Sequence, residues 1–431
     1  MPSQSKLRIA IIGGGLGGLI AARAILCKTG PEAVEIDVYE ATSKMTEIGA
    51  GIVIWPRTWS ILKKLGMEEY LMKLLASPPD KEPSVIFRFR KSDQKEGVLL
   101  HDMIMNGGTM RFHRAELQQA ILDSLQNTAI RFHLSHRLKE YQETGQSIKL
   151  MFEDGSVAQC DYLIGADGIK SSVRRQLILS SPDYFKDDIA SLDPMWSGSY
   201  AYRGLIPIKE LEKLIPNHRA TKNPMMYCGK SKDQLINVVA FVSEPEKEGT
   251  LLSGPQVEEV SQEEFRAMYV GWEPEVQAII SCIKSPKRWA IQALHPMSRY
   301  GVGRVLLIGD AAHAMTPHLG SGAGQAIEDG YVLANVIASY ISDLNYSTRE
   351  ITEAYNRIRR PFGNKILTGS RTQGFWCEFN APGLEGFKEG DDGAEYVEEL
   401  KGLMRRVHKA WEWAWDTAIP GVERVGEMAV L

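Results

Sequence analysis

The chain has few cysteines and no strong excess of charge. Its 431 residues include five cysteines, none of them in a CxxC pair. This excludes a disulfide reductase and argues against a zinc site, and scattered thiols are typical of a reduced cytosol. The formal net charge is −4, so we expect neither a nucleic-acid surface nor a polybasic membrane patch. The sequence also lacks a plausible two-histidine, one-carboxylate cluster, so we expect no metal.

Long apolar runs are lacking as well. No run reaches the roughly 18–20 residues that span a bilayer, and Met1–Arg8 is too short and polar for a signal peptide. We therefore expect a cytoplasmic protein without a membrane span. The composition is ordinary for a globular protein, 44% hydrophobic and 24% charged, and a chain of this length predicts two domains rather than one.

The N-terminus has the pattern of a βαβ unit. Leu7–Ile12 (LRIAII) predicts a buried strand, and the Ala-rich segment Leu19–Cys27 predicts a helix. Val34–Glu40 (VEIDVYE) predicts a second strand. This order and length are typical of a Rossmann-type nucleotide-binding unit.

Glycines join the first strand to the helix, in the spacing GxGxxG. Without Cβ atoms, such a turn lets pyrophosphate approach the backbone at a positively polarised helix N-terminus. Glu40 ends the second strand, where a carboxylate would bind ribose hydroxyls and disfavour a 2′-phosphate. A glycine turn without a ligand is the alternative, and the complete pattern favours a dinucleotide. The residues that we expect to bind it are Gly13, Gly15, Leu16, Gly18 and Glu40.

Two later loops carry an aspartate after an apolar strand. Gly309-Asp310 follows RVLLI, and this carboxylate is placed to accept from a ribityl or ribose hydroxyl. The helix that starts near Gly322 and Ala323 would stabilise an anionic reduced flavin through its N-terminus. The other loop, Gly165–Gly168 (GADG), follows DYLI and could equally be a plain turn.

In combination and order, these motifs resemble those of the group A flavin-dependent aromatic hydroxylases, especially the salicylate hydroxylase type. The matching segments are GxGxxG with Glu40, HRAEL, GADG, GDAAHAMTPHLGSGAGQ, EIGAGI (Glu47–Ile52), AYRGL (Ala201–Leu205) and NVVAFVS (Asn237–Ser243). The resemblance covers nearly the whole chain and implies a monooxygenase with non-covalent FAD and with NADH and O₂ as co-substrates. It also implies that Arg114 contacts FAD, that Asp167 lies between FAD and NADH, and that Asp310 binds the ribityl chain.

The resemblance implies an α/β fold (α+β overall). In it, a Rossmann-like FAD-binding domain is interleaved with a β-sheet substrate domain and followed by a helical C-terminal region. We expect the FAD-binding parts at 1–78, 109–184 and 296–375, the substrate-domain parts at 79–108 and 185–295, and the helical region at 376–431. Within these parts the pattern predicts a hairpin whose return strand is Val157–Ile164 and a tail helix over Ala394–Ala418.

Two polar residues are the candidates for the substrate pocket. Arg203 lies in the predicted strand SYAYRGL, where a guanidinium could pair with a carboxylate or phenolate, although a surface ion pair is the alternative. His318 precedes the glycine loop and could share a phenol proton near neutral pH, or simply bond to backbone. We expect His313 to be structural. Met225–Tyr227 could form an apolar wall or belong to the core.

One departure from the family concerns the segment before NVVAFVS. Where the family has a further strand ending in an aromatic-Pro pair, only Lys230–Gln234 intervene here. Either the pocket lacks a wall or residues are missing from this stretch.

The expected reaction is decarboxylative hydroxylation of salicylate to catechol by a monomer or homodimer. The alternatives are hydroxylation of another phenolic or heteroaromatic substrate without decarboxylation, and a catalytically silent flavin-binding protein.

Overall fold

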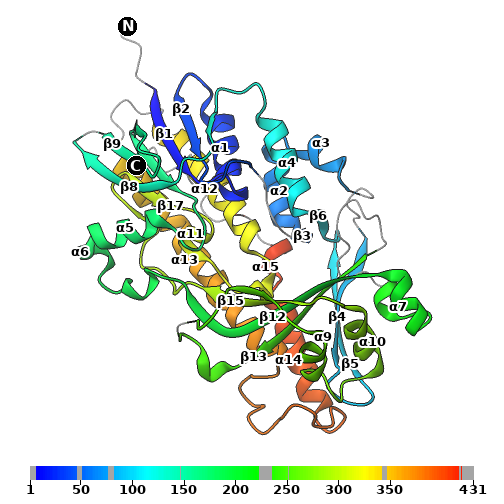
Figure 1. Cartoon of the computed structure of the whole chain (residues 1–431). Coiled ribbons are helices and arrows are strands. Elements are labelled where there is room, and N and C mark those ends of the chain that lie inside the picture. Colours follow the sequence, from blue (N-terminus) through cyan, green and yellow to red (C-terminus); the bar gives the residue numbers. More distant parts are fainter. Residues whose placement is uncertain are drawn as a thin grey trace.

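The computed structural model describes residues 6–45, 51–75, 82–145, 147–222, 235–250, 252–341, 347–416 and 419. Its centre is a six-stranded sheet in the order β16-β17-β11-β1-β2-β7, parallel except for the β16–β17 pair (Figure 1). These strands are β1 (Leu7–Ile12), β2 (Val34–Tyr39), β7 (Arg131–His133), β11 (Tyr162–Gly165), β16 (Gly301–Val302) and β17 (Val305–Leu307). The predicted βαβ unit and the α/β fold class are confirmed.

Two helices, α1 (Leu16–Thr29) and α12 (Gly322–Ile341), pack against each other beside this sheet. Glycines bring the two backbones close together. A Cβ at Gly17 would lie 3.3 Å from the Cβ of Ala326, and one at Gly330 would lie 3.0 Å from the Cα of Ala21. The contact joins two helices that are far apart in the sequence, because 292 residues lie between the end of α1 at Thr29 and the start of α12 at Gly322.

The predicted return strand Val157–Ile164 is in fact two strands in two sheets. β10 (Val157–Cys160) pairs with β9 (Ser147–Phe152) in an antiparallel sheet of order β10-β9-β8, whereas β11 joins the central sheet. The chain changes sheets at Asp161, whose carboxylate accepts hydrogen bonds from the Arg8 guanidinium and backbone. The third strand of this small sheet is β8 (Leu138–Thr144).

A second antiparallel sheet, of order β13-β12-β15-β14, lies below the central sheet (Figure 1). Its strands are β12 (Met195–Pro207), β13 (Leu235–Ser243), β14 (Val257–Glu259) and β15 (Lys287–Ala293). The accompanying helices are α7 (Ile208–Leu214), α8 (Arg219–Lys222), α9 (Gln262–Ala267) and α10 (Pro274–Cys282). A core that includes Tyr202, Ile206 and Phe265 holds these helices against one face of the sheet.

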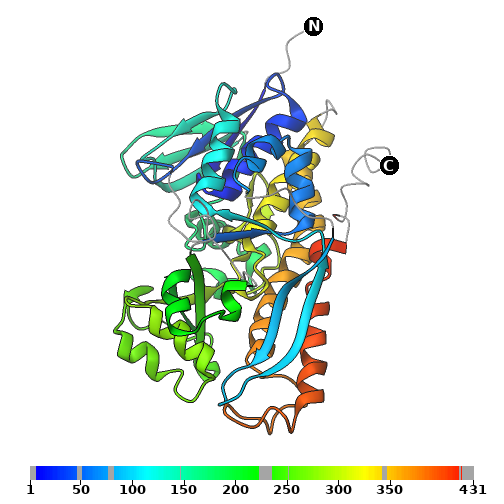
Figure 2. The ribbon, with the colours of Figure 1, turned by 90° about the vertical axis from the view of Figure 1, so that its right-hand side faces the viewer.

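The long helix α13 (Thr348–Cys377) begins with a capping box at Ser347 and Glu350 and crosses the molecule. Hairpin β4 (Pro83–Lys91) and β5 (Val98–Asn106) forms a two-stranded sheet of its own, and it packs against α14 (Val397–Lys409). Figure 2 shows this cyan hairpin and the green sheet that contains β12 and β13 on opposite sides of the lower half. The predicted tail helix is wrong in one respect: it is interrupted after α14 and resumes as the short α15 (Trp413–Asp416).

The remaining elements surround the central sheet. They are β3 (Gly51–Ile54), α2 (Pro56–Lys64), α3 (Glu68–Met72), β6 (Met110–His113), α4 (Arg114–Leu125), α5 (Ser172–Ser180), α6 (Pro182–Phe185) and α11 (Asp310–His313), with short 3₁₀ turns at Ile189–Ser191, Pro245–Lys247 and Pro317–Leu319. Within the described part of the chain, no helix is both long and apolar enough to cross a membrane.

Candidate active site

The glycine turn after β1 brings two chain segments into close contact. Gly13 has a φ of +111°, and a Cβ there would lie 2.3 Å from the carbonyl oxygen of Ala166. Gly18 likewise has no room for a side chain, because its Cβ would lie 2.0 Å from the Gly13 oxygen. Gly15 caps α1, and that helix has no side-chain cap and no acidic residue in its first turn, which begins at Leu16. Its N-terminus therefore has the polarity to hold an anionic group such as pyrophosphate.

Glu40 lies beside this turn at the end of β2. Its Oε2 accepts the Gly14 N–H at 2.8 Å, and its Oε1 accepts the N–H and hydroxyl of Thr42, both at 2.8 Å. The Gly14 carbonyl accepts from Nε2 of Gln118 at 3.2 Å. Gln118 lies one helical turn after Arg114, the first residue of α4. Glu40 and Gln118 thus adjoin the glycine turn. Gln118 was missed, although its i+4 spacing from the predicted Arg114 places both on the same face of α4.

Asp167 has a structural role that the sequence did not predict. Its two carboxylate oxygens accept hydrogen bonds from the Ser171 hydroxyl at 2.5 Å, the Ser172 N–H at 2.8 Å and the Val173 N–H at 3.2 Å. These are the first residues of α5 and its cap, so the carboxylate stabilises the start of that helix. The same loop contacts Gly13 through Ala166, which places Asp167 next to the glycine turn.

Asp310 begins α11 directly after the strand β17 and its Gly309, and it is exposed. Gly309 has a φ of +60°, in the left-handed region. A Cβ at Gly322, the first residue of α12, would lie 3.9 Å from an Asp310 carboxylate oxygen. The structure therefore places Asp310 beside Gly322 and the adjacent Ala323, at the start of α12.

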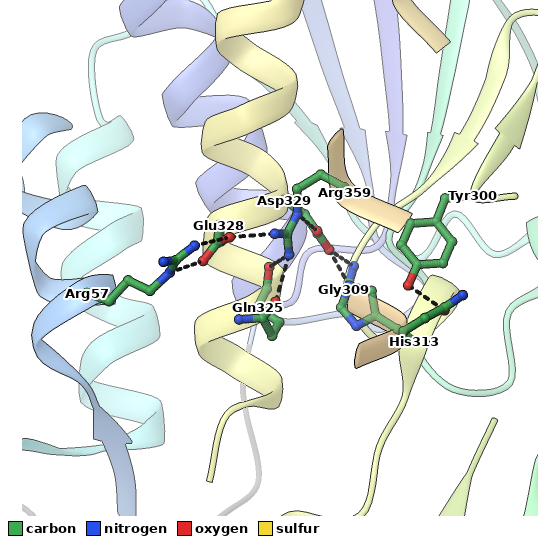
Figure 3. A network of polar contacts seen from close by, with 9 residues as sticks. Arg57, Tyr300, Gly309, His313, Gln325, Glu328, Asp329 and Arg359 are labelled. Carbon is green, nitrogen blue, oxygen red and sulfur yellow. Dashed lines mark hydrogen bonds and ion pairs between the residues drawn. The ribbon is translucent and has the colours of Figure 1, made fainter. Parts of the chain in front are cut away.

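A fully buried network of charges lies behind this turn (Figure 3). Arg57 of α2 donates to both oxygens of Glu328, at 2.8 and 2.9 Å. Arg359 of α13 donates to Glu328 at 2.5 Å, to Asp329 at 2.7 Å and to the Gln325 side chain at 2.8 Å. Because buried ions are costly unless they are paired, two arginines facing two carboxylates form a compensated set. The network fixes α2, α12 and α13 to one another.

Asp329 links this network to the Gly309 turn. Its Oδ2 accepts the Gly309 N–H at 2.8 Å and lies 2.6 Å from Nε2 of His313. Burial raises the pKa of Asp329, but the neighbouring His313 and Arg359 outweigh this and lower it to about 2. The structural role that we predicted for His313 agrees with this contact. Asp329, Arg359 and Arg57 were missed, because each is an ordinary surface-type residue until the three helices are brought together.

Arg203 and Phe241 lie on one face of the β12–β13 pair. Side chains alternate along strands, and the cross-strand partners are Ser199 with Ser243, Ala201 with Phe241, and Arg203 with Val239. The other face carries Tyr202 and packs on the helices of this domain. We call the first set the Arg203 face: Ser199, Ala201, Arg203, Val239, Phe241 and Ser243. The Arg203 guanidinium lies 5.8 Å from the ring centroid of Trp289 on β15.

The imidazole of His318 lies against the Arg203 face. Its imidazole lies 4.8 Å from the Phe241 ring, centroid to centroid, and both ring nitrogens are buried without a hydrogen bond to the described residues. Burial lowers the pKa of His318 to about 4, and the nearby positive charge of Arg371 contributes. The ring is therefore neutral at pH 7, which corrects the expectation of a histidine that titrates near neutrality. The structure brings His318 and the face of Arg203 together.

The carboxyl group of Glu378, which the sequence did not indicate, lies at the end of the Arg203 face beside Ser243. Ser243 donates to Oε1 of Glu378 at 2.6 Å, and the hydroxyls of Ser199 and Ser243 are 2.7 Å apart. Burial raises the pKa of Glu378, although Ser243 and Arg371 act in the opposite direction. No motif marks Glu378, because it follows α13 and reaches the strand only through the tertiary fold.

Some predicted features lie outside the described residues. The stretch EIGAGI is described only from Gly51 onward, and Met225–Tyr227 and Lys230–Gln234 both fall within 223–234. Across the described ranges, no group of three or more histidine, cysteine, aspartate or glutamate side chains is arranged to hold a metal ion.

Comparisons with known proteins agree with this geometry. The model of the FAD binding domain family matches residues 6–370. Salicylate hydroxylase of Pseudomonas putida is 32% identical over 427 residues, which cover 95% of this chain and 93% of that protein. A 6-methylsalicylate 1-monooxygenase of Aspergillus terreus is 30% identical and covers 96% and 91%. A solved salicylate hydroxylase substrate complex superposes with a TM-score of 0.79 at 27% identity, covering 98% of each chain.

Proposed function

Because this chain belongs to the FAD-binding monooxygenase family, and is a flavin-dependent aromatic hydroxylase, we propose that it converts salicylate to catechol with loss of CO₂. In this proposal NADH and O₂ are consumed. One oxygen atom enters catechol, the other leaves as water, and the carboxylate departs as CO₂. When bound, FAD supplies hydride acceptance from NADH and activation of O₂.

The glycine turn, Glu40, Arg114 and Gln118 are proposed to hold the adenosine and pyrophosphate end of FAD. Asp310 would accept from the ribityl hydroxyls, and the N-terminus of α12 at Gly322 and Ala323 would adjoin the flavin ring. The fit rests on the α1 N-terminus, which has no side-chain cap and no acidic residue in its first turn, and on the crowded glycines, which leave no room for side chains at the turn. Asp167 would lie near the cofactor while it holds α5.

One observation supports an aromatic acid as substrate: a neutral, buried histidine faces a sheet surface that carries one arginine among aromatic rings. We propose that Arg203 pairs with the substrate carboxylate or phenolate. Neutral His318 would hydrogen-bond the ortho-hydroxyl, because an unprotonated imidazole nitrogen is an acceptor. Phe241 and Trp289 would hold the ring, and a site shielded from water would favour transfer of oxygen to the substrate over loss as H₂O₂.

The test is product analysis with purified FAD-loaded protein and a panel of hydroxybenzoates. Salicylate should release one CO₂ and one catechol per NADH, whereas benzoate, which lacks the ortho-hydroxyl, should give no hydroxylated product. A dihydroxybenzoate that keeps its carboxylate would refute decarboxylation and leave the hydroxylase class. NADH oxidation that no aromatic acid accelerates, without any oxygenated product, would instead indicate a silent flavin-binding protein.

A further inference from the structure

Two tryptophans donate hydrogen bonds to consecutive carbonyls of the loop that carries His318. The indole N–H of Trp55 donates to the Gly320 oxygen at 3.1 Å, and that of Trp411 donates to the Leu319 oxygen at 2.9 Å. Their side chains are only 2% and 4% exposed. Trp55 precedes α2, and Trp411 lies in the turn between α14 and α15. Segments from opposite ends of the chain therefore meet at one loop.

This loop is short and its path is strictly defined. His318 lies in the turn Pro317–Leu319, and Gly320 adopts left-handed angles of φ 55° and ψ 33°. The Gly320 N–H donates to the Pro317 oxygen at 2.9 Å. In a trans peptide the C=O and the following N–H point in opposite directions. When Trp55 holds the Gly320 carbonyl, the Ser321 N–H is therefore turned the other way, at the start of α12.

The two indoles belong to one aromatic cluster. The Trp55 ring centroid lies 6.2 Å from that of Trp411 and 6.1 Å from that of Trp415, and Phe87 of β4 stacks on Trp411 at 5.3 Å. α15 lies next to α2 in this arrangement (Figure 1). From the opposite side, the Ser370 hydroxyl of α13 bonds to the Leu319 N–H at 3.2 Å and the Thr316 oxygen at 2.5 Å. The loop is thus fixed between α13 and the aromatic cluster.

We propose that Trp411 and Trp55 are positioning residues, whose indole N–H groups hold the 317–320 loop so that His318 stays against Phe241 and α13. Neither tryptophan acts on substrate; each supplies the donor that a buried carbonyl requires. The functional consequence rests on the proposed function, in which His318 faces the substrate. The segment that carries Trp411, between α14 and α15, then serves the active site through the 317–320 loop.

The test compares Trp411→Phe and Trp55→Phe with the control Trp415→Phe, all loaded with FAD. Phenylalanine keeps an aromatic ring in the cluster and removes the donor. Trp415 shares the cluster, and no hydrogen bond of its indole to the loop is seen among the described residues. Hydrogen exchange of the backbone amides at 318–321 should rise on the order of five-fold in Trp411→Phe, the factor that one net hydrogen bond contributes. It should stay unchanged in Trp415→Phe at a similar melting temperature.

The second measurement is the coupling of NADH oxidation to hydroxylation of the substrate. With salicylate, the fraction of NADH that appears as H₂O₂ should rise several-fold in Trp411→Phe and Trp55→Phe but not in the control. Unchanged exchange, or equal increases in all three variants, would overturn the positioning role, and so would faster exchange with wild-type coupling. If Trp411→Phe does not fold, Trp55→Phe decides by the same two measurements. If wild-type NADH oxidation ignores every aromatic acid, the proposed function fails, while the exchange data still decide the role of the indoles.

Discussion

Gly374 of α13 provides the space that the imidazole of His318 occupies. A Cβ at Gly374 would lie 2.6 Å from both Cε1 and Nδ1 of that ring. Glycine inside a helix lowers stability by roughly 0.5–1 kcal/mol relative to alanine, so a glycine near the end of this long helix needs a compensating reason. The position of the His318 ring supplies one.

Gly374→Ala should therefore destabilise the protein, even though alanine is the better helix former. The added methyl must displace His318 from Phe241, and we expect a loss of about 1–3 kcal/mol together with poorer coupling of NADH oxidation to product. The matched control is Gly369→Ala on the same helix, where the nearest atom of Leu319 would be 3.6 Å away. That variant should be neutral or stabilised by about 0.4–1 kcal/mol. Equal melting temperatures for both variants would contradict the argument.

The buried imidazole also predicts a pH dependence. Burial lowers the pKa of His318 in the folded protein to about 4, from the 6.5 that is usual for histidine. Between these two pKa values the imidazole is protonated in the unfolded chain and neutral in the folded protein. The free energy of unfolding therefore decreases as the pH falls from about 6.5 to about 4. The effect should be on the order of 2–3 kcal/mol. The free energies of unfolding of wild type and His318→Gln, plotted against pH over this range, should converge at low pH. Parallel curves would refute this pH dependence.

Glu40→Ala should weaken FAD retention. The carboxylate holds the Gly14 N–H and is placed for the ribose, and loss of hydrogen bonds to a charged acceptor costs on the order of 1.5–3 kcal/mol. Titration of the apoprotein with FAD should therefore show a dissociation constant raised about ten-fold or more. Glu35→Ala is the control, because Glu35 lies on the same strand but pairs with Arg131. A colourless wild-type protein that binds NAD and not FAD would overturn the assignment.

Arg203→Ala should raise the KM for the aromatic acid and leave FAD bound. Loss of a charge-assisted contact should remove roughly 2–4 kcal/mol of transition-state stabilisation, which is measured as a lower kcat/KM. Arg203→Lys should recover only part of this stabilisation. Arg266→Ala removes an exposed arginine of α9 in the same domain and serves as the control. If Arg203→Ala lowers FAD affinity and leaves KM unchanged, then the arginine acts elsewhere.

Asp329→Asn should be among the most destabilising single substitutions in the chain. It leaves Arg359 with one carboxylate fewer inside the core, for which about 3–5 kcal/mol is typical, and it weakens the hold on the Gly309 N–H. Because the folded pKa of Asp329 is lowered to about 2 from 3.8, its contribution is present above pH 4 and is lost as the pH falls toward 2. Glu398→Gln, at an exposed pair with Lys401, should change the melting temperature little.

The parts of the site that sequence could predict are those fixed by short stretches of chain. The glycines, Glu40 and the Gly309-Asp310 turn each belong to a strand, turn and helix whose pattern is complete within about 30 residues. Arg57 and Glu328 are 271 positions apart, and Ser243 and Glu378 are 135 apart. Nothing local distinguishes them from solvated side chains. The sequence singled out His318 by its place before the glycine loop, but its pKa depends on the burial that β13 and α13 impose together.

The strand order of the central sheet also governs how the chain matures during synthesis. β11 pairs with β1 on one side and with β17 on the other. β17 is translated only after all four strands of the β13-β12-β15-β14 sheet. Until then, the edge of β11 has no partner in its own chain, and an open edge invites pairing with other chains. α13, which carries Arg359, is translated later still, so Glu328 and Asp329 are synthesised before one of their two arginines. A nascent chain stalled before residue 305 should therefore depend on chaperones, even though its FAD fingerprint has long been complete.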